Sequence, residues 1–295
     1  MRKIILLSIV FLMLVVPIAS AMEILSNDNS MKNNEKQSLS QDFTHSVLVE
    51  YGSLTTCPPC VTANAQLKSI YNSDDYDFNY VTLVWDKGNA RVRARLQELT
   101  INNVPDVYFD GKYSNIIGGQ TNEIPYINEI VQAGERDVPD LDIDLDVVWV
   151  GNGILKISGI VNNNEPEPYN GIIRTYIVEK ESRWNDNGGN PYHFAVLDIP
   201  IDKSVNIVSK QIKPIEETYT FEKTWVGLLR GFVNIKKENI MVIATVFDAE
   251  TDHAIETAVG EPTSQSTTQE IPLLIQRFIS RFPIFQQIIY NLLIK

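Results

Sequence analysis

The first part of the chain alternates short apolar runs with stretches of helical spacing. Residues 46–51 form a β-rich run, and 78–85 is mostly apolar, which predicts a central strand. Asp110 and Gly111 predict a hairpin turn between strands at 106–109 and 112–117. Helical spacing predicts the remaining elements, helices at 61–71, 89–99 and 123–133. Residues 43–136 therefore read as an α/β domain of order β-α-β-α-β-β-α.

The periodicity changes after a short polar connector at 136–139. Clusters of Asn, Gly, Pro and Asp now separate strand-like runs, and 141–147 alternates apolar with acidic residues, as in a strand with one wet face. The predicted strands are 141–150, 154–161, 171–178, 193–201, 205–212, 218–225, 239–247 and 254–259. This spacing predicts an all-β, Ig-like sandwich over 140–260.

The N-terminus has the pattern of an export signal. Arg2 and Lys3 precede an apolar run, and 19–21 supplies small residues for cleavage, so 1–21 reads as a signal peptide. An uncleaved membrane anchor is the competing interpretation. Either places the rest of the chain outside the cytoplasm, secreted or on the outer side of a membrane. Residues 22–42 are polar and predict a flexible tether.

The C-terminal end differs again. Residues 261–270 form a polar linker, and 271–295 carries apolar residues at three- and four-residue spacing, with Arg277 and Arg281 beside the stripe. This segment predicts either contact with a membrane surface or docking on the β domain or another copy.

The net charge of −12 argues against a nucleic-acid partner, which would require clustered basic residues. The informative motif is instead the pair of cysteines, the only two in the chain. Cys57 and Cys60 are separated by Pro58 and Pro59, at the start of a predicted helix. This spacing permits a Cys57–Cys60 disulfide, and a helix start favours a thiolate. No organic cofactor is needed for thiol chemistry.

The two cysteines have two other interpretations, a zinc site and a structural disulfide. A zinc site needs about four ligands, yet the only histidines, His45, His193 and His253, are scattered along the chain. No metal site is predicted there. A structural disulfide suits an exported protein, but a loop this short constrains the unfolded chain little.

Possible calcium ligands at 185–187 and 248–252 are unspecific.

With Val104–Pro105 opening the third strand and Glu50 in the first, residues 43–136 resemble a thioredoxin-like domain. The resemblance implies a cis Pro105 that shapes the client groove, with Cys57 attacking and Cys60 resolving. It also implies proton transfer by a buried acid, for which Glu50 is the candidate, unless its side chain points outward. The chain departs from the family at Thr56, where Trp is usual, and at Asp106, where Thr is common.

With its β-sandwich, the whole chain resembles the Omp-type (twenty-eight-kilodalton outer-membrane protein) family. Its expected function is extracytoplasmic thiol–disulfide exchange on exported proteins. Pro58 and Pro59 offer no N–H to a thiolate, which favours a reductant or isomerase recharged by a membrane electron donor. The rival hypothesis is a surface binding or adhesion module on a thioredoxin scaffold, with a purely structural disulfide.

Overall fold

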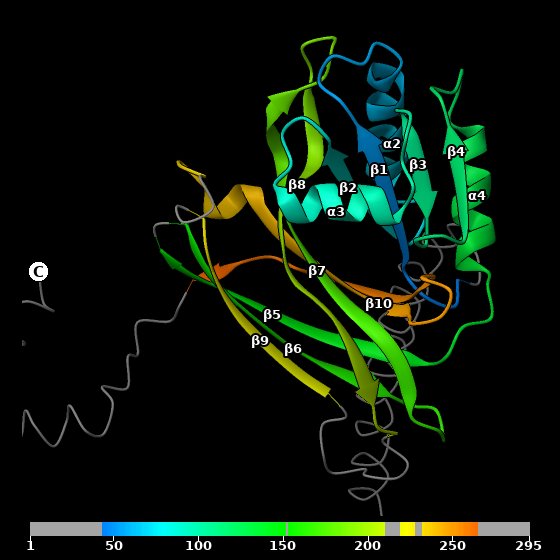
Figure 1. The fold of residues 1–295 in the computed structure, drawn as a ribbon, viewed down its shortest axis with the longest axis vertical. Helices are drawn as coiled ribbons and strands as arrows, with labels where there is room; N and C mark the ends of the chain where they lie inside the picture. The colour runs from blue at the N-terminus through cyan, green and yellow to red at the C-terminus, as the bar shows by residue number, and fades with distance from the viewer. Residues whose placement is uncertain (1–42, 152, 210–218, 228–231, 265–295) are drawn as a thin grey trace, which may run out of the picture.

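The computed structural model describes residues 43–151, 153–209, 219–227 and 232–264. Strands dominate this part of the chain (Figure 1). Its helices are α2 (Cys60–Ser73), α3 (Ala90–Glu98), α4 (Ile124–Gly134) and the short η2 (Lys237–Asn239). Its strands are β1 (Val47–Ser53), β2 (Phe78–Val84), β3 (Asp106–Phe109), β4 (Ser114–Ile117), β5 (Leu141–Gly151), β6 (Ile154–Asn163), β7 (Tyr169–Asn185), β8 (Pro191–Ile207), β9 (Tyr219–Val226), β10 (Ile240–Asp248), β11 (Ala254–Gly260) and β12 (Thr263–Ser264).

The local elements predicted for the first part of the chain are confirmed. α2 begins directly after Pro59, where a missing N–H costs the helix nothing. The side chain of Asn89 caps α3 by accepting hydrogen bonds from the N–H groups of Arg91 and Val92. At the predicted β3–β4 turn, Asp110 and Gly111 both adopt positive φ angles, of 45° and 64°.

The predicted fold class, an α/β thioredoxin-like domain followed by a separate all-β sandwich, is wrong. Strands from both predicted domains form one eight-stranded mixed sheet, in the order β11-β10-β7-β8-β2-β1-β3-β4. The two parts join where β8 pairs in parallel with β2, at Thr82 and Ala195. β2 is buried along nearly its whole length, and β1 covers only one of its two edges. β8 supplies the second neighbour that such a central strand requires.

The hairpin of β7 and β8 is longer than the sequence predicted. The sequence predicted two separate strands, at 193–201 and 205–212. In the structure, one continuous strand, β8, runs through the first of them and on to Ile207. The register shifts opposite Thr175 and Ile177, so that β8 carries an extra residue beside Pro200. A bulge accommodates a proline, which cannot donate to the ladder. In Figure 1 the hairpin runs from the part of the molecule built by β5, β6 and β9 to the end where β1 meets α2.

A second sheet, of order β12-β5-β6-β9, packs against part of the first. β10 is buried on both faces: Met241 and Ile243 contribute to the core beneath the helices, and Val242 and Ala244 to the core between the sheets. Such double burial explains why the mostly apolar sequence of β10 shows no alternation of apolar and polar residues.

The predicted signal peptide (1–21), tether (22–42), most of the linker (261–270) and the amphipathic segment (271–295) lie outside the described residues. Among the described helices, none has the length and apolar character needed to cross a membrane.

Candidate redox site

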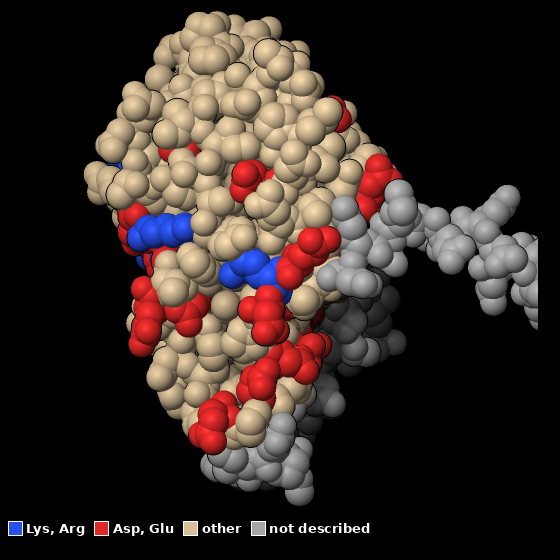
Figure 2. All heavy atoms as spheres, turned by 90° about the vertical axis from the view of Figure 1, so that its right-hand side faces the viewer, with Lys and Arg blue, Asp and Glu red and all other residues tan. Residues whose placement is uncertain are grey.

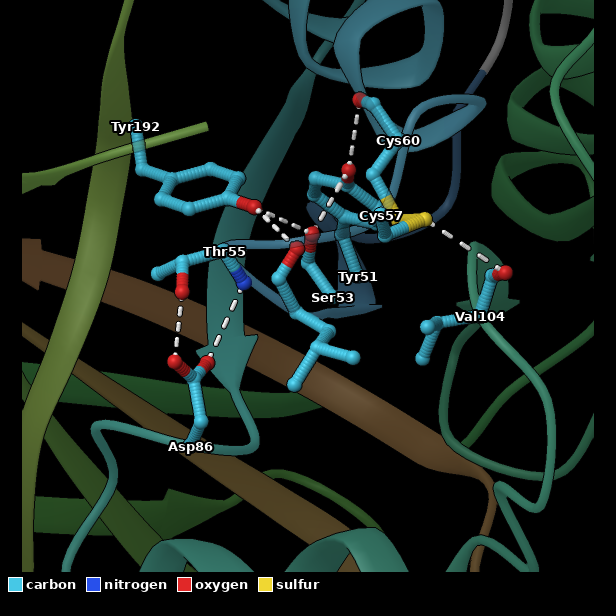
Figure 3. The surroundings of a disulfide bond; sticks show 9 residues. Tyr51, Ser53, Thr55, Cys57, Cys60, Asp86, Val104 and Tyr192 are labelled. Carbon is cyan, nitrogen blue, oxygen red and sulfur yellow. Dashed lines mark hydrogen bonds between the residues drawn. A yellow bond between two sulfur atoms is a disulfide. The ribbon is translucent and has the colours of Figure 1, made fainter. Parts of the chain in front are cut away.

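Cys57 and Cys60 form a disulfide at the N-terminal end of α2 (Figure 3). The loop after β1 brings them there: the N–H of Cys57 donates to the carbonyl of Leu54 (3.0 Å), and that of Cys60 to the carbonyl of Cys57 (3.3 Å). Their Cα atoms are 5.4 Å apart. The predicted pairing of the two cysteines is therefore present in the structure.

The two cysteines differ in access to solvent. Cys57 is 6% exposed and Cys60 is fully buried at 0%. Pro58 and Pro59, between them, are exposed. A partner that approaches this end of α2 meets the sulfur of Cys57 before that of Cys60.

The Val104–Pro105 peptide bond is cis, as the resemblance implied. The carbonyl oxygen of Val104 lies 3.6 Å from the Cys57 sulfur (Figure 3). A disulfide sulfur carries no hydrogen, so this is a contact in the oxidised protein. After reduction, the Cys57 thiol is placed to donate to the same oxygen, whereas a thiolate would face its negative charge.

Residues 118–120 close the other side of the motif. The N–H of Gly118 donates to the carbonyl of Pro105 at 2.8 Å. A Cβ on Gly119 would lie 2.7 Å from the carbonyl oxygen of Pro59, so only glycine permits this approach. The cis proline, the cysteine motif and this loop are thus held against one another.

A chain of hydroxyl groups lies beneath the disulfide (Figure 3). The Tyr51 hydroxyl donates to the carbonyl of Cys60 (2.8 Å), and Ser53 Oγ lies 3.0 Å from Tyr51 Oη and 2.8 Å from Tyr192 Oη. The Tyr192 hydroxyl also reaches the carbonyl of Leu54 at 3.1 Å. Three hydroxyl protons serve these four contacts, so one contact lacks a proton at any moment.

These hydroxyls are neutral at physiological pH. Burial raises the pKa of Tyr51 well above its ordinary value of 10, and raises the pKa of Tyr192 to about 12. The groups in contact with the Cys60 segment are therefore uncharged donors and acceptors.

Glu50, the predicted proton carrier, is buried but points away from the cysteines. Neighbouring residues of a strand project to opposite faces, so Glu50 leaves β1 on the face opposite Tyr51. Its carboxylate accepts two hydrogen bonds from Arg95 of α3 (2.9 and 2.7 Å) and one from the Tyr176 hydroxyl of β7 (2.7 Å). This geometry gives no support to a proton relay through Glu50.

Two aspartates border the site in different environments. Burial raises the pKa of Asp106, next to the cis proline, although a 2.9 Å hydrogen bond from Asn115 partly opposes the effect. At Asp86, hydrogen bonds from Thr55 outweigh the effect of burial and lower the pKa. Asp106 is only 3% exposed, so its carboxyl group has little contact with solvent.

Sequence reasoning missed Tyr51, Ser53 and Tyr192. The period of two along β1 places Tyr51 and Ser53 on the face opposite Glu50, and this signal could have found them. Tyr192 has no local signal, because it lies 139 residues from Ser53 and reaches the site through the β2–β8 pairing.

The acidic segments suggested as calcium ligands are engaged within the protein. Asp186 accepts from the N–H groups of Gly188 and Asn190, and Asp248 from those of Glu250 and Thr251. In the described part of the chain, no three His, Cys, Asp or Glu side chains are grouped so that they could hold a metal ion.

Comparisons with known proteins give distant similarities. No protein-family model matches the chain, and no curated protein sequence does. A structure from Agrobacterium tumefaciens aligns with a TM-score of 0.42 and 12% identity, over 73% of this chain and 93% of that one. A domain of the outer-membrane lipoprotein Omp28 from Porphyromonas gingivalis aligns with a TM-score of 0.28 and 12% identity, over 44% and 96%. A Pyrococcus furiosus CARDB domain crystallised with di-metal ions gives 0.24 and 14%, over 43% and 90%. At these TM-scores the similarities establish no shared function.

Proposed function

We propose that this protein exchanges disulfides with thiols or disulfides of exported proteins, through Cys57 and Cys60. The observation that carries the proposal is the asymmetric disulfide at the start of α2. Cys57 is at the rim, beside a cis proline, and Cys60 is buried behind it. A slightly exposed cysteine beside a fully buried one suits an attacking and a resolving cysteine.

The exchange proceeds in two steps that balance. The Cys57 thiolate attacks one sulfur of a client disulfide, forms a Cys57–client disulfide and releases one client thiolate. The Cys60 thiolate then attacks the Cys57 sulfur, forms the Cys57–Cys60 disulfide and releases the second client thiolate. The client gains two electrons, and the released thiolates take up protons according to their pKa. The reverse sequence oxidises a client dithiol.

The surroundings of Cys57 favour the reducing direction. Pro58 and Pro59 provide no N–H donors, and the Val104 carbonyl oxygen faces the Cys57 sulfur. A dithiol whose thiolate is poorly stabilised gives up its electrons more readily. Continued reduction of clients then requires a thiol donor that regenerates the pair, for which a membrane electron donor is the partner.

An extracytoplasmic location supports this chemistry. The N-terminal residues 1–21 have the composition of an export signal. Disulfides persist in oxidising compartments outside the cytoplasm. A lipoprotein of the outer membrane among the distant structural neighbours agrees with this location without establishing it.

The test separates the roles of the two cysteines. Reduced Cys60→Ser protein, incubated with a peptide disulfide, should accumulate a mixed disulfide at Cys57, detected as added mass on the intact protein. Reduced Cys57→Ser protein should accumulate at least about tenfold less, because Cys60 is buried.

The wild-type protein provides the control, since it should release the peptide as thiol and return to the Cys57–Cys60 disulfide. If reduced wild type and Cys60→Ser both leave the peptide disulfide intact over hours, the proposal fails. The disulfide would then be structural, as in the hypothesis of a binding or adhesion module.

A further inference from the structure

The tip of the β7–β8 hairpin contacts the helix that carries Cys60. Asn64, one turn after Cys60 and 3% exposed, donates from Nδ2 to Asp186 Oδ2 (3.0 Å) and to the carbonyl of Pro191 (3.2 Å). Gly188 approaches so closely that an added Cβ would lie 3.1 Å from Val61 Cγ1. The start of α2 is therefore fixed against a segment that is distant in the sequence.

The hairpin tip is itself held in one shape. Oδ1 of Asp186 accepts from the N–H groups of Gly188 (2.8 Å) and Asn190 (3.0 Å). The other carboxylate oxygen, Oδ2, remains for Asn64. Asp186 is 5% exposed, so these hydrogen bonds form away from bulk water.

The same hairpin also contacts the loop that carries Cys57. Tyr192 follows the tip, and its hydroxyl reaches the carbonyl of Leu54 (3.1 Å) and Ser53 Oγ (2.8 Å). Its ring packs edge-on against Tyr51, with centroids 6.4 Å apart. The N–H of Cys57 donates to the carbonyl of Leu54. Tyr192 and the Cys57 backbone thus meet at one carbonyl group.

We infer that the tip of the β7–β8 hairpin is a positioning element of the redox centre, which acts through Asn64 and Tyr192 to hold the two cysteine-bearing segments together. The inference rests on the proposed function for its biological role. Asn64 anchors the segment after Cys60, and Tyr192 anchors the segment before Cys57.

The consequence for the redox pair follows from proximity. Holding the segments of Cys57 and Cys60 together raises the effective concentration that each thiol presents to the other. This favours formation of the Cys57–Cys60 disulfide. It also brings Cys60 to the Cys57 sulfur when a mixed disulfide must be resolved. Loss of either anchor should therefore make the disulfide easier to reduce and slow the resolving step.

The test compares Tyr192→Phe, Asn64→Leu and the double variant with wild type. The equilibrium of each disulfide with dithiothreitol is measured by alkylation and mass, and folding is checked by thermal unfolding. The double variant should favour the reduced form about tenfold more than wild type, equivalent to about 30 mV toward a more oxidising potential. Tyr192→Phe keeps the ring and should show a smaller shift in the same direction, even if the double variant fails to fold.

Tyr80→Phe is the matched control, since it removes a buried hydroxyl of β2 that has no hydrogen-bond partner among the described residues. It should leave the equilibrium unchanged. A folded double variant within twofold of wild type overturns the inference, as does an equal shift in Tyr80→Phe. If the double variant does not fold, the inference is judged on Tyr192→Phe, and an equilibrium with dithiothreitol equal to that of wild type overturns it. The equilibrium with dithiothreitol can be measured whether or not the protein reacts with clients. A protein that fails to exchange with a peptide disulfide would therefore contradict the proposed function and leave this inference to its own test.

Discussion

At the scale of single residues, Asp106 is an acid beside the cis proline that is held in a buried position. Burial raises its pKa above the usual 3.8, and the carboxylate keeps one hydrogen bond, from Asn115. An acid with a raised pKa in the folded state destabilises the protein as pH rises from its unfolded pKa through its folded pKa. The stabilisation is complete below that window and lost above it. Asp106 therefore costs stability at neutral pH.

The substitution Asp106→Asn removes this cost. The amide oxygen can still accept from Asn115, so the variant should be more stable than wild type at pH 7, by on the order of 1 kcal/mol. The two proteins should converge well below pH 3.8, where Asp106 is protonated in both states. Urea unfolding at several pH values measures the difference. Asp144→Asn, at an exposed position of β5, is the control and should show little change. Equal pH dependence in the two variants would contradict this account.

At the scale of elements, a buried ion pair connects β1 to α3 and to β7. Arg95 is 1% exposed and donates to both carboxylate oxygens of Glu50, while the Tyr176 hydroxyl donates to one of them. Arg95 also donates to Asp252 in the β10–β11 turn, at 2.8 Å. The pairing thus joins strands from both parts of the eight-stranded sheet, and it accounts for Glu50 without a role in proton transfer.

Removing one partner of the Glu50–Arg95 ion pair should destabilise the protein strongly, whereas replacing both partners should destabilise it much less. Arg95→Met leaves the Glu50 carboxylate buried and should lower the free energy of unfolding by about 3–5 kcal/mol. The double variant Glu50→Gln, Arg95→Met should recover much of that loss. Lys180→Met, which breaks an exposed pair with Glu261, should cost less than about 1 kcal/mol. All are measured by urea unfolding.

Glu50→Gln also decides between a structural and a catalytic role. A structural carboxylate predicts reduced stability with an unchanged reduction potential and an unchanged pH profile of exchange. A slower resolving step with a shifted pH profile would instead establish the proton relay that the sequence suggested.

At the scale of the whole molecule, local patterns predicted the elements but not their pairing. Cys57, Cys60 and the cis Pro105 lie close together in the structure. The sequence could predict this, because these residues lie at the start of α2 and directly before β3, and both elements were predicted from local patterns. No local sequence pattern predicts that β8 pairs with β2, since the residues of β8 would suit any central strand. The mostly apolar sequence of β2 predicted a central strand, but it did not identify β8 as the neighbour on its second edge.

The charges of the molecule are unevenly distributed. On the face drawn in Figure 2, charged side chains gather away from the end of the molecule at which β1 meets α2. Four segments meet around the disulfide, and none contains Asp, Glu, Lys or Arg: 51–67, 99–105, 113–122 and 187–197. The chain nevertheless carries a net charge of −12. Apart from Asp86, which binds Thr55, and the buried Asp106, the charged side chains therefore lie away from the sulfur that a client must reach.

This distribution predicts exchange that depends little on salt. Electrostatic steering changes association rates strongly only when charges lie close to the contact, since the screening length is about 10 Å at 0.1 M salt. The rate with a neutral peptide disulfide should change less than about twofold between 0.02 and 0.5 M NaCl. Thr56→Lys puts a charge at an exposed position next to Cys57. This variant should react faster than wild type with an acidic peptide, and the advantage should disappear at high salt. A tenfold salt effect on wild type with acidic or basic peptides would show that distant charges govern the encounter.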